Sequence, residues 1–318
     1  MKEKTAKMPL LPKVKDFLDK FNQQQEILKA SHHKTTALNN REGSDATGKI
    51  FLTEIQAVDE VIDDEIMSGK YPICVRIYNP NKQQKLPVLL YFHGGGFVSG
   101  DVVQFDPIFR QIANYTNHIV VGVEYRLAPE FPYPICVEDS KTAIAGIFDI
   151  LDARDIGYLD KNLSIAGDSA GGGICTIICS DRDFVMKHNI KHQVLFYPVT
   201  DFTLNIPSIE TLKNGYFLTR EKITWYFNKL FQNNEDLYQV SPLFKEFYSE
   251  MPKTLTFISE YCPLKDCGTY YYNKIKNIVA ESELIEVKGV THAFLTLESL
   301  NKEECISAYK KMNEFLAK

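Results

Sequence analysis

The sequence predicts an α/β protein with a mostly parallel, twisted sheet that carries helices on both faces. The apolar runs at residues 87–92 and 118–123 are continuous rather than alternating, which is typical of central strands covered on both sides. From residue 49 onward, strand-like runs alternate with helical segments, and this alternation indicates parallel strands joined by crossover helices. At 318 residues, the chain can bury a sizeable core as one large domain or two ordinary ones.

The expected elements follow from the spacing of apolar residues along the chain. Val14, Phe17, Leu18 and Phe21 recur at helical spacing, so we expect a helix over residues 14–30, followed by a polar loop to residue 48. Strands are expected at residues 50–58, 73–78, 87–92, 118–123, 163–166, 194–197, 255–259 and 284–287. Further helices are expected at residues 107–116, 138–151, 170–179 and 301–316.

Composition argues against several classes of partner. A formal net charge of −5 gives no reason to expect nucleic acid or an anionic membrane surface as partner. No apolar run approaches the length that spans a membrane, and residues 1–11 lack the apolar core of a secretory signal. The seven cysteines are odd in number and show no paired framework, so we expect reduced thiols in a cytoplasmic protein.

Two short motifs near the N-terminus resemble ligand sites but lack the residues such sites need. Residues 43–49 have the spacing of a phosphate-binding loop, yet Ile50 stands where a serine or threonine would hold magnesium, and no strand is expected before them. His32 and His33 have no further ligands at metal-site spacing around them. We therefore expect neither a phosphate site nor a metal site in this region.

Residues 201–241 interrupt the alternation of strands and helices. The segment is helix-like and aromatic, with Trp225, Tyr226 and Phe227 in succession. An insertion directly after a core strand is typical of a lid over a site, and its aromatic side chains would then line a pocket. Periodicity is equally compatible with an ordinary helical excursion packed against the sheet, so both interpretations stay open.

The most informative stretch is Gly167-Asp168-Ser169-Ala170-Gly171, which has the form Gly-x-Ser-x-Gly. It follows the apolar run at residues 163–166 and leads into an apolar helix, so we expect the serine at the apex of a sharp strand-to-helix turn. Small flanking residues permit such a turn, and a helix that begins there directs free N–H groups towards nearby negative charge. Ser169 is therefore a candidate nucleophile.

Two further segments make this serine interpretable. His93-Gly94-Gly95-Gly96 follows the central strand at residues 87–92, and an open glycine turn can direct several backbone N–H groups at one point. Donors of this kind stabilise the oxygen that gains charge during acyl transfer, by roughly 3 to 4 kcal/mol per donor. His292 lies on a loop after the last expected strand, where it could accept the serine proton.

Five motifs resemble, in their order, the signature of the hormone-sensitive-lipase-like carboxylesterases of the α/β-hydrolase fold. They are Phe92-His93-Gly94-Gly95-Gly96-Phe97, Glu124-Tyr125-Arg126-Leu127-Ala128-Pro129-Glu130, Gly167-Asp168-Ser169-Ala170-Gly171-Gly172, Tyr197-Pro198 and Ser241-Pro242-Leu243. The resemblance implies an eight-stranded core at residues 49–202 and 241–318, with a helical cap or lid at residues 1–48 and 203–240. It also implies hydrolysis of small, short- to medium-chain acyl esters through an acyl-serine intermediate, without metal or organic cofactor.

The resemblance further implies roles for single residues. Ser169 would be the nucleophile and His292 the general base. The backbone N–H groups of Gly95, Gly96 and Ala170 would form the oxyanion hole. Gly94 would help to shape the glycine turn.

Other residues of the motifs receive less specific expectations. Phe97 and Asp168 are candidate substrate-binding residues. For Asp168, hydrogen bonds that hold the serine turn are the alternative role. We expect Arg126 and Glu130 to form a structural ion pair rather than to act in catalysis.

One departure from the family concerns the acid of the catalytic triad. The family carries this aspartate in a segment like Asp-Pro-Leu-Arg-Asp-x-Gly, whereas this chain reads Glu260-Tyr261-Cys262-Pro263-Leu264-Lys265-Asp266-Cys267-Gly268. Cys262 stands at the aspartate position. A neutral thiol cannot accept a strong hydrogen bond from the imidazole or stabilise the imidazolium that forms during attack. In serine proteases, loss of the acid's charge lowers turnover about 10⁴-fold.

Several arrangements stay open on the sequence alone. Asp266 or Glu260 could supply the acid, Ser169 and His292 could act as a weak dyad, or Cys262 could act as a thiolate against His292. The alternative to an esterase is a hydrolase scaffold that has lost most turnover and binds a small-molecule ligand. The expected partner of an esterase is a small ester. The sequence leaves open whether the chain forms a homodimer.

Overall fold

The computed structural model describes residues 8–318, so the first seven residues of the predicted cap segment 1–48 lie outside the described residues. Within this range, eight strands form one sheet in the order β1-β2-β4-β3-β5-β6-β7-β8. The strands are β1 Glu60–Ser68, β2 Tyr71–Asn79, β3 Leu86–Phe92, β4 Ile119–Val123, β5 Tyr158–Asp168, β6 Ile190–Phe196, β7 Lys253–Tyr261 and β8 Glu283–Thr291. β2 pairs antiparallel with β1 and β4, and the remaining pairs are parallel. The predicted eight-stranded, mostly parallel sheet is confirmed.

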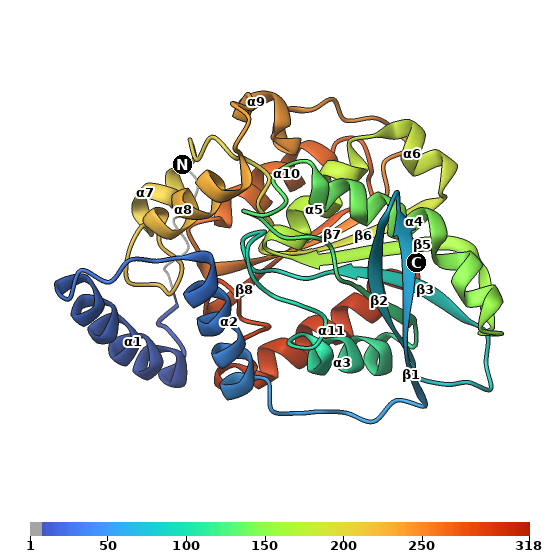
Figure 1. The fold of residues 1–318 in the computed structure, drawn as a ribbon, viewed down its shortest axis with the longest axis horizontal. Coiled ribbons are helices and arrows are strands. Elements are labelled where there is room, and N and C mark those ends of the chain that lie inside the picture. Colours follow the sequence, from blue (N-terminus) through green and yellow to red (C-terminus); the bar gives the residue numbers. More distant parts are fainter. Residues whose placement is uncertain (1–7) are drawn as a thin grey trace.

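Helices cover both faces of this sheet (Figure 1). The helices are α1 Pro12–Ala30, α2 Ala37–Phe51, α3 Asp106–Thr116, α4 Ile135–Ala153, α5 Ala170–Cys179, α6 Arg182–Lys187, α7 Pro207–Thr211, α8 Arg220–Leu230, α9 Leu237–Val240, α10 Lys265–Ile275 and α11 Lys302–Leu316, with short 3-10 turns at Pro242–Phe244 and Glu298–Leu300. α3 and α11 pack on one face, and α4, α5 and α10 pack on the other. The predicted helix over residues 170–179 coincides with α5.

The central strands are buried as their continuous apolar runs predict. Leu89 and Leu90 of β3 and Val120 and Val121 of β4 are fully buried, with register pairs that join the two strands along their length. Burial of each such side chain contributes about 1.5 to 3 kcal/mol. This rigid centre fixes the carboxyl ends of β3 and β5, where the glycine turn and the serine turn begin.

The N-terminal region differs from the expectation. Residues 37–51 form the helix α2 rather than a loop, because Thr36 and Asn39 complete a capping box in which each side chain bonds the other residue's backbone N–H. The strand expected at residues 50–58 is wrong, since α2 continues to Phe51 and the first strand of the described residues begins at Glu60. β1 escapes detection because its side chains are only half-buried and include several carboxylates.

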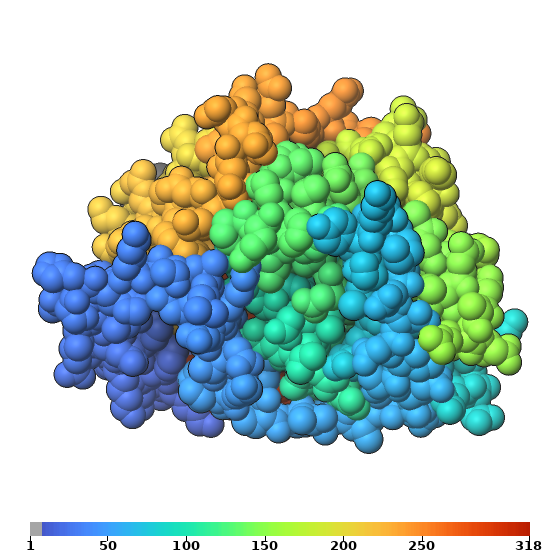
Figure 2. All heavy atoms as spheres, viewed as in Figure 1, coloured from blue at the N-terminus to red at the C-terminus, as the bar shows by residue number. Residues whose placement is uncertain are grey.

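The N-terminal helices contact the inserted segment after β6. The rings of Phe17 and Phe21 on α1 lie 5.8 and 5.2 Å from the ring of Phe217, and Phe17 also contacts Phe51 of α2 at 5.2 Å. The Asn22 amide donates a hydrogen bond to the Gly215 carbonyl at 3.1 Å. Figure 2 shows these parts side by side on the face in view, with the N-terminal helices in blue and the insertion in gold.

The expected ion pair between Arg126 and Glu130 is wrong. Arg126 makes two hydrogen bonds to the buried carboxylate of Asp139, at 2.8 and 2.6 Å. Glu130 instead pairs with Arg41 of α2, at 2.9 and 2.5 Å. The sequence gives no signal for this exchange, because Arg41 lies 89 residues away from its partner.

Two further findings concern the chain as a whole. All seven cysteines lie in the described part of the chain, and all are free thiols. None of the helices formed by residues 8–318 is long and apolar enough to cross a membrane.

Candidate active site

Ser169 occupies a strained turn between β5 and α5. Its backbone φ of 51° and ψ of −112° are rarely adopted by residues other than glycine, and its N–H donates to the Phe196 carbonyl at 2.8 Å. The flanking glycines are required by space. A Cβ at Gly167 would lie 2.4 Å from the carbonyl carbon of Gly171, and a Cβ at Gly171 would lie 1.8 Å from the Phe92 carbonyl oxygen. The turn therefore projects the Ser169 side chain from the carboxyl end of β5.

His292 lies next to this serine, directly after β8. Its Nε2 is 2.8 Å from Ser169 Oγ, across a separation of 123 residues. Only 5% of the His292 surface is exposed, and burial lowers the pKa of its imidazole to about 3. The Tyr197 ring makes a T-shaped contact with the imidazole, with centroids 4.8 Å apart. A neutral imidazole with a free lone pair on Nε2 can accept the serine proton.

Cys262 supplies the partner on the other side of the imidazole. Its Sγ lies 3.1 Å from His292 Nδ1, and the backbone N–H of Leu264 donates to the same sulfur at 3.3 Å. The Cys262 side chain is fully buried, and burial raises the pKa of the thiol well above its usual range. Burial therefore disfavours the thiolate that was one of the expected arrangements.

The polarity of this sulfur contact decides what the imidazole can do. If Nδ1 carries the hydrogen, it donates to Sγ, and Nε2 is free to accept the proton of Ser169. If the thiol donates its hydrogen to Nδ1, the ring carries its own hydrogen on Nε2 and cannot act as the base. The N–H of Leu264 already uses the sulfur as an acceptor, which is compatible with the productive arrangement.

The two carboxylates considered as replacement acids lie elsewhere. Glu260 is buried, but its oxygens accept the N–H groups of Gly289 at 3.0 Å and Met8 at 3.1 Å. Asp266 accepts the N–H of Ser208 at 2.8 Å, because the first turn of α7 leaves this donor without a helical partner. Among residues 8–318, no carboxylate is hydrogen bonded to His292. Both proposals for the acid are therefore corrected to structural roles.

The glycine loop, defined here as residues 93–99, faces the serine turn. Gly94 donates its N–H to Asp168 Oδ1 at 2.8 Å, so this group is not available as an oxyanion donor. Gly95 has a φ of 119°, and a Cβ there would lie 1.8 Å from the Ser99 carbonyl oxygen. The N–H groups of Gly95 and Gly96 have no acceptor among residues 8–318.

The third predicted oxyanion donor is the backbone N–H of Ala170. Ala170 is the first residue of α5, so its N–H has no helical acceptor one turn earlier. Together with the free N–H groups of Gly95 and Gly96, it provides the kind of donor set that a developing negative charge needs.

The predicted substrate-binding residues are buried instead. Asp168 is 2% exposed, and its carboxylate also accepts the Tyr91 hydroxyl at 3.2 Å. Burial raises the pKa of Asp168 to about 7. Phe97 is 1% exposed and packs against the Phe202 ring at 6.2 Å. Asp168 thus takes its alternative role and ties the glycine loop to the serine turn, whereas Phe97 anchors the loop in the core.

Two neighbours of the glycine loop were missed by sequence reasoning. Tyr226 of α8 lies against Gly96, where a Cβ would come within 2.4 Å of the ring. Arg41 of α2 donates to the Val98 carbonyl at 2.8 Å. The aromatic composition of residues 201–241 was a signal for Tyr226, but no motif marks Arg41.

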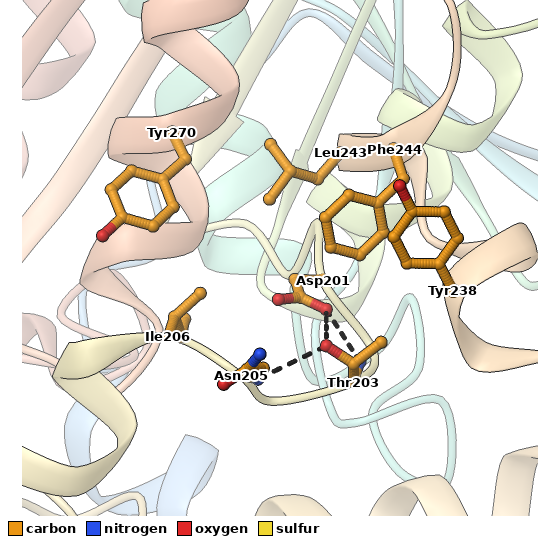
Figure 3. Close-up of a pocket in the computed structure, with 8 residues that line it drawn as sticks. All are labelled: Asp201, Thr203, Asn205, Ile206, Tyr238, Leu243, Phe244 and Tyr270. Carbon is orange, nitrogen blue, oxygen red and sulfur yellow. Dashed lines mark hydrogen bonds between the residues drawn. The ribbon is translucent and has the colours of Figure 1, made fainter.

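A cavity of about 370 Å³ lies apart from this constellation (Figure 3). The lining residues come from the loop after β6, from the return of the insertion and from α10, and they are Asp201, Thr203, Asn205, Ile206, Tyr238, Leu243, Phe244 and Tyr270. Neither Ser169 nor His292 is among them. Within residues 8–318, no group of three histidine, cysteine or acidic side chains is placed to hold a metal ion.

Comparison with known proteins adds independent information. A family model described as the α/β-hydrolase fold matches residues 89–296. The sequence is 32% identical to Esterase LipI of Mycobacterium tuberculosis over 249 residues, which cover 76% of this chain and 76% of the relative. It is 30% identical to the arylesterase of Saccharolobus solfataricus over 296 residues, which cover 91% of this chain and 93% of the relative. The structure is similar to that of an esterase from the archaeon Pyrobaculum calidifontis, with a TM-score of 0.86, 29% identity and coverage of 96% and 97%.

Proposed function

Because this chain belongs to the hormone-sensitive-lipase-like carboxylesterases of the α/β-hydrolase fold, we propose that it is a serine hydrolase of small carboxylic esters. One observation carries the proposal. The Ser169 hydroxyl, held in a strained turn, lies 2.8 Å from His292 Nε2, and the facing glycine loop carries two backbone N–H groups without an acceptor among residues 8–318. The ligand-binding scaffold without turnover is not favoured, because the relatives are esterases.

The reaction would begin with the ester carbonyl beside Ser169. Ser169 Oγ attacks the carbonyl carbon while His292 Nε2 takes the hydroxyl proton. The carbonyl oxygen becomes negative and is stabilised by the N–H groups of Gly95, Gly96 and Ala170. The bond to the alcohol then breaks, and the alcohol leaves with the proton returned by His292.

The second half of the reaction regenerates the enzyme. Water attacks the acyl group on Ser169 while His292 takes one of its protons. Collapse of this second tetrahedral species breaks the bond to Ser169 Oγ, which recovers its proton from His292. The carboxylic acid is released, and neither step consumes a cofactor.

In this scheme, Cys262 orients the imidazole but provides little charge. Its sulfur accepts the hydrogen on Nδ1 and so holds His292 in the productive tautomer. A neutral sulfur does not compensate the positive imidazolium, so we expect lower turnover than an aspartate at this position would allow.

The cap is the second part of the proposal. Residues 1–48 and 203–240 would form it, and the rest of the chain would form the hydrolase core. The ring contacts of Phe17 and Phe21 with Phe217 support the two parts acting as one cap. Short- to medium-chain esters are the proposed substrates, and the arylesterase relative makes phenolic esters suitable probes. The homodimer and the cytoplasmic location stay predictions.

Covalent labelling tests the nucleophile directly. A fluorophosphonate probe reacts with an activated serine, so intact-protein mass spectrometry should show one adduct on the wild type, mapped to Ser169. Ser169→Ala should abolish this adduct, and His292→Ala should slow its formation because no base remains. Ser180→Ala, on a side chain that bonds the Ile177 carbonyl, is the matched control and should label like the wild type. Equal labelling of wild type and Ser169→Ala would overturn the proposal.

A further inference from the structure

The two ends of the glycine loop are held by different parts of the molecule. At its start, the Gly94 N–H donates to Asp168 Oδ1 at 2.8 Å, and the Tyr125 hydroxyl donates to the His93 carbonyl at 2.7 Å. Both partners belong to the core. Beyond Gly94, the core contributes the Ala128 N–H, which donates to the Phe97 carbonyl at 2.9 Å. Further contacts to the loop come from α2 and α8, which lie in the two parts of the proposed cap. The loop therefore bridges the core and the cap.

Arg41 of α2 makes the most extensive of these contacts. Its Nε donates to the Val98 carbonyl at 2.8 Å, its Nη2 donates to the Ala128 carbonyl at 3.0 Å, and its guanidinium pairs with the Glu130 carboxylate. The planar guanidinium presents several donors in a fixed fork, so one side chain can satisfy all three acceptors. The Val98 N–H donates to the Gly95 carbonyl at 3.2 Å, which connects Arg41 to the proposed oxyanion donors.

Tyr226 of α8 holds the same loop from another direction. A Cβ at Gly96 would lie 2.4 to 2.6 Å from three atoms of the Tyr226 ring, so this ring rests directly on the Gly96 Cα. The Tyr226 hydroxyl donates to Asn40 Oδ1 at 3.3 Å, and Asn40 precedes Arg41 on α2. The two cap helices are thus joined to each other at the point where both contact the loop.

We propose that Arg41 and Tyr226 are positioning residues that aim the N–H groups of Gly95 and Gly96 at the reacting carbonyl oxygen. The inference rests on the proposed esterase function. Asp168 fixes the loop at Gly94, and the Ala128 N–H holds the Phe97 carbonyl. Between and beyond these points the Tyr226 ring rests on Gly96 and Arg41 holds the Val98 carbonyl, so the directions of the two N–H groups also depend on how α8 and α2 are seated. Stabilisation of the oxyanion is therefore coupled to the position of the cap.

The size of the effect follows from the geometry of catalysis. Oxyanion donors act at distances of about 2.7 to 3.1 Å, and loss of one donor lowers kcat about 10²- to 10³-fold. A displacement of about 1 Å can cost about 10²-fold. Loss of a positioning residue that leaves the donors in place should cost about 10- to 100-fold in kcat, with little change in KM.

Arg41→Met tests the first contact, with Glu130→Gln as its matched control. Arg41→Met removes the bonds to Val98 and Ala128, whereas Glu130→Gln removes the ion pair and leaves both bonds. We expect Arg41→Met to lower kcat for p-nitrophenyl butyrate about 10- to 100-fold. The inhibition constant of a trifluoromethyl ketone, whose adduct with Ser169 places an oxyanion in the hole, should rise by the same factor. In Glu130→Gln, kcat and the inhibition constant should each stay within about threefold of the wild-type value, as expected when an exposed ion pair is lost.

Tyr226→Ala and Tyr226→Phe test the second contact independently. Tyr226→Ala removes the ring from Gly96 and should lower kcat and inhibitor affinity together. Tyr226→Phe keeps the ring, loses the hydroxyl's bonds to Asn40 and Ser99, and should remain near the wild type if the ring is what positions Gly96. This pair decides the question if Arg41→Met fails to fold in a thermal melt.

The outcomes separate this inference from the proposed function. A wild type that neither hydrolyses the ester nor binds the ketone would contradict the esterase itself. A wild type that does both, with Arg41→Met and Tyr226→Ala unchanged, would overturn the positioning role alone. A rise in KM without a change in kcat or inhibition constant would also overturn it, because the cap would then contact only the substrate.

Discussion

Replacing Cys262 by aspartate would restore a charged partner to His292. Sγ lies 3.1 Å from Nδ1, so a carboxylate there would place its charge about 4 Å from the imidazolium. At an effective dielectric constant of about 20, such a pair is worth about 4 kcal/mol. This energy corresponds to about 10³-fold in rate if it acts only on the charged transition state.

Burial reduces the gain. The Cys262 side chain is fully buried, so the new carboxylate must lose its hydration, and the Leu264 N–H replaces only part of it. We therefore expect Cys262→Asp to raise kcat about 10- to 100-fold. Cys262→Asn has the same shape without the charge and should not exceed the wild type.

The pH profile gives a second readout of the same change. The reaction needs a neutral His292, and burial holds its pKa at about 3 in the wild type. An adjacent carboxylate stabilises the imidazolium and therefore raises this pKa. The acid limb of kcat/KM should therefore move to higher pH in Cys262→Asp and stay in place in Cys262→Asn. An aspartate variant that folds like the wild type yet matches the asparagine variant in both kcat and pH profile would contradict a role for charge at this position.

Three further expectations concern stability. Burial raises the pKa of Asp168 to about 7, above its unfolded value of about 3.9. The stability that the protonated side chain contributes is therefore fully present below about pH 4 and is lost as the pH rises to about 7. Between pH 5 and pH 8, the free energy of unfolding measured in urea should thus fall by about 2 to 3 kcal/mol more in the wild type than in Asp168→Asn. Equal decreases in the two proteins would contradict this. Gly171→Ala should destabilise by about 3 kcal/mol, because the new Cβ meets the Phe92 carbonyl at 1.8 Å, whereas Gly43→Ala on open helix surface should stabilise by about 0.5 to 1 kcal/mol. Thr36→Ala removes the cap of α2 and should cost about 1 kcal/mol, and an unchanged melting temperature would argue against the capping box.

Much of the core could be predicted because its signals are local. The continuous apolar run of β3 and the glycine-flanked Ser169 each determine a conformation from a few neighbouring residues. The position of Cys262 at the end of β7 also follows from its motif, and the structure places its sulfur on His292 Nδ1.

The parts that sequence could not supply depend on distant partners. Asp168 bonds Gly94 across 74 residues, and Arg41 reaches Val98 across 57. Glu260 and Asp266 looked like candidate acids because they are close to Cys262 in the chain, yet their carboxylates bond the N–H groups of Gly289 and Ser208. Spacing along the chain predicts which residues come near a site but not which way their side chains point.

The role of Ser169 as nucleophile is tested by hydrolysis of p-nitrophenyl butyrate, measured side by side for the wild type and Ser169→Ala. We expect turnover in the wild type that falls to the level of the uncatalysed reaction, or close to it, in Ser169→Ala, with both proteins melting at the same temperature. Equal rates in the two proteins would contradict an acyl-enzyme on Ser169.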